Sequence, residues 1–153
     1  MQNQPMSAYE QSDHSKRWLY AAAALSLIAG LIHLVVAPEH FEEWLGYGLF
    51  FGVATVAQLM YALLLVAGKP TRSLLLAGII GNGLIIGLYL VTRTLGIPFL
   101  GPHAGHVEPV GVLDALSKIV ELGLMACLVM MWHGQSDAAS GGWPGGRANL
   151  LLL

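Results

Sequence analysis

The histidines and glutamates of this chain include six residues whose types and spacing suit a transition-metal site. These candidate ligands are His33, His40, Glu43, His103, His106 and Glu108. Imidazole and carboxylate groups suit zinc, copper or iron, and the lack of clustered Cys or Met argues against a Cu(I)-only site. His40-x-x-Glu43 and His103-x-x-His106 each let two ligands reach one ion, so the two pairs together predict a four-ligand site. The alternative is that the glutamates solvate a surface helix, the loop histidines are exposed and His33 is hydrogen-bonded between helices.

A second group of charges lies inside apolar runs. It consists of Arg93, Asp114, Lys118 and Glu121. A charge at the centre of a membrane span costs roughly 2.5–3.5 kcal/mol, so these groups must be compensated. Lys118 neighbours both Asp114 and Glu121 on one helix, and Arg93 can meet Asp114. The group is either a structural ion-pair cluster or a functional one: a proton or ion path, or a polar pocket open to the outside, with Glu121 as its deepest carboxylate.

Other polar residues in the apolar runs are Gln58, Asn82 and Tyr89, which we expect in the interior of the protein. No nucleophile elbow or zincin motif is present, and Ser117 is too close in sequence to Lys118 to face it on a helix. The sequence therefore favours a non-enzymatic role. A net charge of −2 with no basic stripe argues against nucleic acid as a partner.

Composition indicates what positions these groups. The 153 residues are 56% hydrophobic and only 10% charged, whereas soluble domains carry roughly 25% charged residues. A bilayer core requires about 20 apolar residues per helix. Four runs meet that length, at about 18–37, 48–67, 74–95 and 110–132. The prediction is an all-α fold, a four-helix transmembrane bundle within residues 18–133, with the lipid bilayer as its surroundings.

The segments around the spans complete the predicted topology. Residues 1–17 form a polar tail and residues 134–153 a disordered tail. Pro38 to Tyr47 reads as a short interfacial helix after the first span, with Phe41, Trp44 and Leu45 in the membrane surface. If the chain has four spans, its basic residues concentrate on one side of the membrane. The prediction is therefore a multi-pass protein of the cell membrane with both termini in the cytoplasm. The basic residues on that side are Lys16, Arg17, Lys69, Arg72 and Arg147.

Two GxxxG pairs, Gly48 with Gly52 and Gly83 with Gly87, suggest close helix contacts. Such contacts would suit a homo-oligomer or a partner in a membrane complex.

Two longer stretches of the sequence carry a resemblance. The first is His33-Leu-x-x-Ala-Pro-Glu-His-Phe-x-Glu-Trp-x-Gly-Tyr-Gly-Leu-Phe-Phe51. The second is Tyr89-x-x-x-Arg-Thr-x-Gly-Ile-Pro98, continued by Gly101-Pro-x-Ala-Gly-x-x-Glu-Pro-Val-Gly111 and Asp114. Both resemble a group of small, uncharacterised bacterial four-span membrane proteins, and the resemblance spans about residues 18–132. It implies fold and location but no activity.

Three functions follow as expectations. The first is a small integral membrane protein whose outer-face His/Glu cluster binds copper, zinc or iron, as a carrier, sensor or accessory factor. The second is a proton- or ion-coupled transport or channel element built on the intramembrane charges. The third is a structural subunit of a larger membrane complex.

Overall fold

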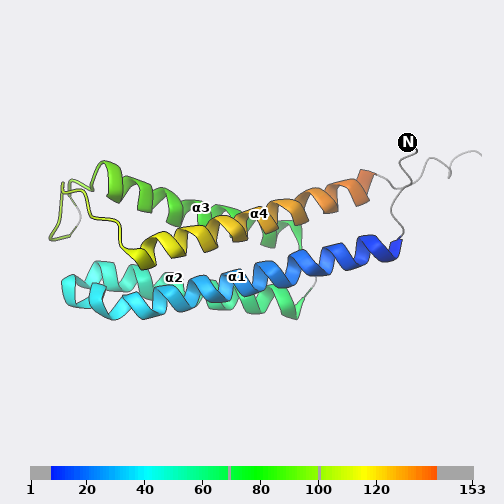
Figure 1. The fold of residues 1–153 in the computed structure, drawn as a ribbon, viewed down its shortest axis with the longest axis horizontal. Helices are drawn as coiled ribbons and strands as arrows, with labels where there is room; N and C mark the ends of the chain where they lie inside the picture. The colour runs from blue at the N-terminus through cyan, green and yellow to red at the C-terminus, as the bar shows by residue number, and fades with distance from the viewer. Residues whose placement is uncertain (1–7, 69, 100, 141–153) are drawn as a thin grey trace, which may run out of the picture.

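The computed structural model describes residues 8–68, 70–99 and 101–140, which form four helices and no strand. The helices are α1 (Ala8–Glu43), α2 (Leu45–Ala67), α3 (Arg72–Thr94) and α4 (Val112–Ser140). All four run along one long axis, and the start of α1 lies at the same end as the end of α4 (Figure 1). The all-α prediction is confirmed.

Three of these helices are long and apolar enough to cross a membrane. They are Ser15–Glu43 within α1, Leu45–Ala67 and Arg72–Thr94. Helices suit this environment because every backbone polar group in the hydrocarbon must be satisfied within the segment. The fourth helix, α4, differs because Asp114, Lys118 and Glu121 interrupt its apolar sequence. The chain is therefore a helical membrane protein with one strongly charged helix.

The expected interfacial helix after the first span does not form a separate element. The first helix, α1, continues through Pro38 to Glu43, and the chain breaks only at Trp44, whose backbone is extended. Proline removes one backbone donor, but a helix at a membrane tolerates that loss when its neighbours support it. Two backbone hydrogen bonds keep the break to one residue. Trp44 N donates to the His40 carbonyl, and Gly48 N donates to the Trp44 carbonyl.

Glycines allow this abrupt reversal between α1 and α2. A Cβ on Gly46 would lie 2.0 Å from the Trp44 ring, and a Cβ on Gly48 would lie 2.1 Å from the Phe41 ring and 2.7 Å from its Cα. Gly52, in contrast, faces open space, as do Gly83 and Gly87 of the other GxxxG pair. The Gly48 position therefore serves contact within the chain, and an oligomer through the open glycines stays a prediction.

The tails expected at both ends are partly helical. Residues 8–17 belong to α1, and α4 continues to Ser140, beyond the expected end of the fourth span. Extending a helix that is already nucleated in an apolar segment costs little free energy, because each added residue gains one backbone hydrogen bond. Residues 1–7 and 141–153, which complete the two predicted tails, lie outside the described residues.

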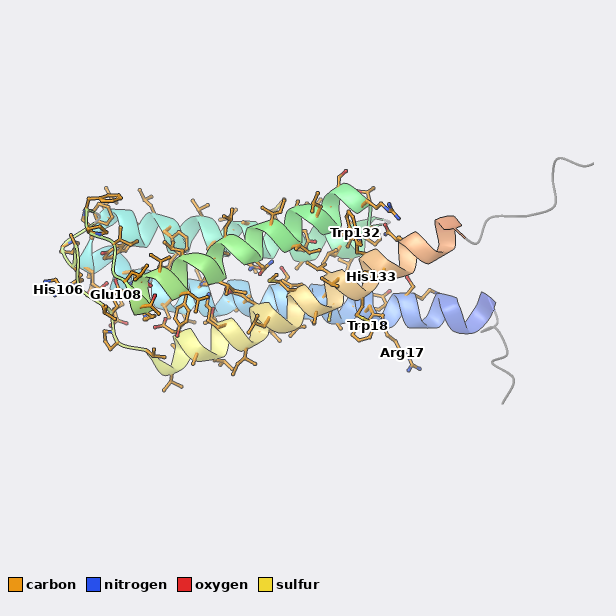
Figure 2. All side chains as sticks on the ribbon, turned by 90° about the horizontal axis from the view of Figure 1, so that it is seen from above. Arg17, Trp18, His106, Glu108, Trp132 and His133 are labelled. Carbon is orange, nitrogen blue, oxygen red and sulfur yellow. The ribbon has the colours of Figure 1, made fainter. Side chains whose placement is uncertain are left out.

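The interior is apolar at the end where the described chain begins and ends. Leu65, Leu75, Leu124 and Leu128 are fully buried there, beside the buried free thiol of Cys127. In Figure 2 this end carries Arg17, Trp18, Trp132 and His133, whereas His106 and Glu108 lie at the other. α1 packs most extensively with α2 and then with α4, and α3 packs mainly with α4.

A polar ladder crosses the bundle next to this apolar layer. The Ser26 hydroxyl lies 2.8 Å from both the backbone and the side-chain oxygen of Gln58. Gln58 Nε2 donates to Asn82 Oδ1 at 3.0 Å, and Asn82 Nδ2 donates to the Gly78 carbonyl at 2.8 Å. The predicted interior positions of Gln58 and Asn82 thus serve to join α1, α2 and α3. Such bonds between helices are typical glue in membrane bundles.

The glycine contacts predict different outcomes for two alanine substitutions in one motif. Gly48→Ala should lower the unfolding free energy by about 1–3 kcal/mol, because its Cβ meets the backbone of Phe41 and cannot be accommodated by a rotamer change. Gly52→Ala should be neutral or stabilising, because the site is open and alanine favours helix. Denaturant unfolding in detergent, followed by circular dichroism, measures both. Equal effects of the two substitutions would contradict the observed turn.

Candidate functional site

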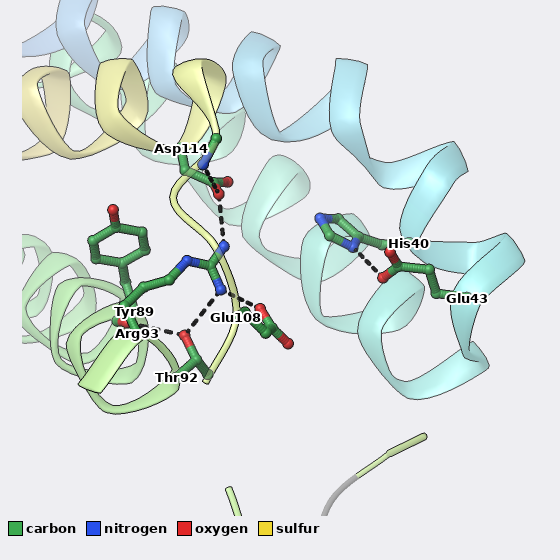
Figure 3. A network of polar contacts seen from close by, with 8 residues as sticks. His40, Glu43, Tyr89, Thr92, Arg93, Glu108 and Asp114 are labelled. Carbon is green, nitrogen blue, oxygen red and sulfur yellow. Dashed lines mark hydrogen bonds and ion pairs between the residues drawn. The ribbon is translucent and has the colours of Figure 1, made fainter. Parts of the chain in front are cut away.

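Arg93 joins three parts of the chain near the end of α3 and the start of α4 (Figure 3). Its Nη2 donates to Asp114 Oδ2 at 2.6 Å, and its Nη1 pairs with Glu108 Oε2. Glu108 also donates its backbone N–H to the Thr92 carbonyl at 3.1 Å. The predicted meeting of Arg93 with Asp114 is confirmed. The three residues Arg93, Glu108 and Asp114, here the outer triad, connect α3, the loop 95–111 and α4.

Glu121 is a fully buried carboxylate one level deeper in the bundle. Its Oε1 lies 2.9 Å from His33 Nε2 and accepts from the Ser117 hydroxyl at 3.2 Å. Its Oε2 accepts from Lys118 Nζ at 2.5 Å. His33, Lys118 and Glu121 are here the inner cluster. The pairing of Lys118 with Glu121 follows from their spacing in the sequence, whereas the His33 contact joins α1 to α4 across 88 positions.

Tyr89 lies between the outer triad and the inner cluster. Arg93 Cζ and Lys118 Nζ each lie 5.3 Å from the centroid of its ring. Both distances are within the range in which the electron-rich face of an aromatic ring attracts a cation. The predicted interior tyrosine is therefore a partner of two charged side chains, which its sequence position alone did not indicate.

A cavity of about 120 Å³ opens beside these charges and is here the inner cavity. All three groups that contact Glu121, namely His33, Ser117 and Lys118, line it, and Tyr89 and Arg93 do so too. The rest of the wall is mainly apolar: Ile32, Val36, Phe50, Phe51, Ile85, Leu88 and Leu113. A cavity of this size holds several waters or one small ring. The deepest carboxylate is thus one side chain away from a solvent-sized space.

A wider opening, the vestibule, covers the inner cavity on the side of the loop 95–111. It measures about 600 Å³, and its polar lining residues include Glu39, His40, Glu43, His103, His106 and the outer triad. His40, Arg93, Glu108 and Asp114 line both spaces. The outer triad therefore stands at the boundary between the vestibule and the inner cavity.

The loop that frames the vestibule folds back on itself and onto α2. Gly105 N donates to the Ile97 carbonyl at 2.9 Å. Gly101 has a φ of +78° and approaches Tyr47 so closely that a Cβ would lie 2.5 Å from its hydroxyl oxygen. Only glycine adopts this backbone conformation without strain at such a contact. These contacts place His103, His106 and Glu108 at the opening of the vestibule.

The six predicted metal ligands do not gather at one point. Five of them line the vestibule, but His33 lies in the inner cluster, and Glu108 is paired with Arg93. His40 Nδ1 lies 3.0 Å from Glu43 Oε2. Within residues 8–140, as far as the structure describes them, no three His, Cys, Asp or Glu side chains are placed to hold one ion. A metal site stays a prediction, and its ligands would have to move together.

The charges of the site do not balance. Arg93 and Lys118 supply two positive charges, while Glu108, Asp114 and Glu121 supply three negative charges, which leaves one negative charge when His33 is neutral. Within the described residues, the buried atoms without a hydrogen-bonding partner include His33 Nδ1 and Arg93 Nε. One added proton on the His33–Glu121 pair would bring the net charge to zero.

The outer triad predicts strong coupling between its members. Arg93→Gln should lower the unfolding free energy by about 2 kcal/mol, between the values for exposed and buried ion pairs, because it leaves two partly buried carboxylates without a cation. Asp114→Asn in the Arg93→Gln background should restore part of that loss. Denaturant unfolding of the two single variants and the double variant measures the coupling. Strictly additive losses would show that the pair contributes no net stability.

Comparison with known protein families, with curated proteins and with solved structures finds no match to this chain. What the protein does must therefore be argued from the charged groups themselves and from the spaces that they line.

Proposed function

We propose that all four helices cross the membrane, with the chain ends in the cytoplasm and the loop 95–111 outside. Support for the fourth span comes from its two faces: Leu116, Ile119 and Leu122 are exposed, while Lys118 and Glu121 point into the bundle. A helix with an apolar exterior and inward charges suits a bilayer. Arg17 lies at the end opposite the loop (Figure 2), next to Lys16 in the sequence, and Arg72 begins α3 at that same end (Figure 1), as the positive-inside rule requires. The last turn of α1, after Pro38, would lie at the outer surface.

The function that the site supports best is proton binding from the outer side, as the coupling centre of an ion- or proton-coupled membrane carrier. The observation that carries this proposal is the fully buried Glu121, whose three polar partners all line a cavity that shares His40, Arg93, Glu108 and Asp114 with the vestibule. A carboxylate buried in hydrocarbon is costly unless it is paired, and ionisable groups in that position commonly serve ion or proton pathways. Glu121 is paired and lies close to the cavity.

The direction of access follows from the asymmetry of the interior. Toward the outside, the inner cavity and the vestibule share Arg93, Glu108 and Asp114. Toward the cytoplasm, the packed leucine layer of Leu65, Leu75, Leu124 and Leu128 closes the bundle. The arrangement corresponds to an outward-facing state. A carrier would complete its cycle by opening that apolar layer, as in alternating access.

The charge imbalance explains why a proton is the preferred ligand. The inner cluster and outer triad together lack one positive charge, and His33–Glu121 is a pair that accepts a proton without leaving a carboxylate uncompensated. The medium around buried charges strengthens such an imbalance relative to water. A proton also does not need several coordinating side chains around it, as a metal ion does.

The proposal predicts loss of flux when the buried carboxyl group is neutralised. In liposomes carrying a pH gradient, Glu121→Gln should reduce protein-dependent proton flux to the level of empty vesicles, because glutamine keeps the size and cannot carry the proton. Glu42→Gln is the matched control, since Glu42 is exposed at the outer end of α1 and lines neither space. A fluorescent pH indicator inside the vesicles reports the rate. Flux that persists in Glu121→Gln, or is absent from the unaltered protein, would contradict this function.

We propose a second function, binding of copper, zinc or iron at the vestibule, on one specific observation. His40, Glu43, His103 and His106 come from two distant segments, yet they line the same space. Imidazole and carboxylate ligands suit these ions. The His103–His106 segment would have to close onto α1 for the four side chains to share one ion.

Metal binding predicts a stoichiometric ion that depends on the loop histidines. Purified protein loaded with Zn²⁺ or Cu²⁺ and desalted should retain near one equivalent, and the double variant His103→Ala, His106→Ala should retain less than half as much. His133→Ala is the control, because His133 is exposed at the opposite end of the molecule. Elemental analysis measures the ratio. Equal retention in all three proteins would attribute the metal to some other site.

A further inference from the structure

The outer triad and the inner cluster form a two-level ladder between α3 and α4. The helices run in opposite directions, so Arg93 meets Asp114 at the outer level, and Tyr89 meets Lys118 one turn deeper. Tyr89 and Arg93 are four residues apart on α3, as Asp114 and Lys118 are on α4, and such pairs lie on one helix face. Between residues 8 and 140, where the structure describes them, no hydrogen bond or ion pair links the triad directly to the cluster.

The ring of Tyr89 is the contact that the two groups share. Arg93 Cζ and Lys118 Nζ lie at the same distance from its centroid, 5.3 Å. Its hydroxyl makes no hydrogen bond to the part of the chain that the structure describes, and the side-chain hydrogen bond that reaches Tyr89 ends on its backbone carbonyl, which accepts from Thr92 Oγ1 at 2.9 Å. The aromatic face, rather than the hydroxyl group, is therefore what Tyr89 contributes.

We propose that Tyr89 is a positioning residue that holds Lys118 against Glu121 and couples this pair to the outer triad. The inference rests on the proposed proton-binding role of Glu121. Lys118 has a flexible stem, and the electron-rich ring confines its ammonium group at 2.5 Å from Glu121 Oε2. Because Arg93 uses the same ring, a change in the triad alters where Lys118 rests. The protonation of Glu121 then reports the state of the outer boundary.

The charged surroundings of Glu121 allow this effect to be isolated. His33 approaches it from α1 and Lys118 from α4, while α3 contributes Arg93 only through Tyr89. The remaining helix, α2, carries no charged or histidine side chain between Leu45 and Ala67. The charged groups through which a change at Tyr89 reaches Glu121 are therefore Lys118 and Arg93.

The test is an infrared titration of the Glu121 carboxyl band in the full-length protein, with the band assigned by its loss in Glu121→Gln. Tyr89→Leu should raise the pH at which half of Glu121 is protonated by about one unit, a tenfold change in proton affinity, because Lys118 no longer stabilises the carboxylate as firmly. Tyr89→Phe should restore the original midpoint, because it keeps the ring. A midpoint unmoved by Tyr89→Leu, or moved equally by Tyr89→Phe, overturns the inference.

Two further variants secure the result. A trifluorinated phenylalanine at position 89 keeps the shape of the ring and weakens its negative face. It should therefore shift the midpoint as Tyr89→Leu does, and it serves as the test if the leucine variant does not fold. A midpoint equal to that of Tyr89→Phe overturns the inference. In the Arg93→Gln background, the effect of Tyr89→Leu should differ by about half a unit from its effect alone, and strict additivity overturns the coupling. A Glu121 band that never titrates overturns the proposed function and this inference together, whereas a titrating band insensitive to the ring overturns the inference alone.

Discussion

The burial of Glu121 is the constraint on which the rest of the site depends. A carboxylate with no exposed surface in a bundle of this composition requires partners on every side, and it finds three: His33, Ser117 and Lys118. His33 must then come from α1, which fixes how α1 faces α4. Lys118 in turn needs support, and the ring of Tyr89 brings in α3. One buried charge thus determines the mutual rotation of three helices, because removing any partner would leave an uncompensated group in a poorly solvating medium.

The two halves of the bundle solve different problems. The half that contains the start of α1 and the end of α4 is a packed layer of leucines that needs no specific polar geometry, and the Ser26–Gln58–Asn82 ladder borders it. The half next to the loop 95–111 contains the paired charges and the two spaces that share lining residues. Close packing at one end and charged, accessible space at the other suit the outward-facing binding site that we propose. The short reversal at Trp44 contributes by bringing Phe50 and Phe51 of α2 to the wall of the inner cavity.

Sequence reasoning succeeded where local spacing carries the information. Arg93 and Asp114 were expected to meet because each lies near the outer end of an adjacent span, and Lys118 with Glu121 follows from helical periodicity. The contact between His33 and Glu121 depends on how α1 and α4 rotate against each other, which no local pattern encodes. Glu108, a predicted metal ligand, pairs with Arg93, and its loop has no periodicity that would indicate this contact. Pro38 indicated the start of a new helix, yet α1 continues through it, because tertiary support outweighs the loss of one backbone bond.

We propose that Glu121 is protonated from the outer side, where the loop 95–111 lies. The direct measurement is an infrared titration of its carboxyl band in sealed proteoliposomes of known orientation, with the pH varied independently on each side. The protonated fraction should follow the outer pH, on the side of the loop 95–111, and be insensitive to the inner pH, because the leucine layer closes the opposite end of the bundle. A protonated fraction that follows the inner pH, or a band that does not titrate from either side, would contradict it.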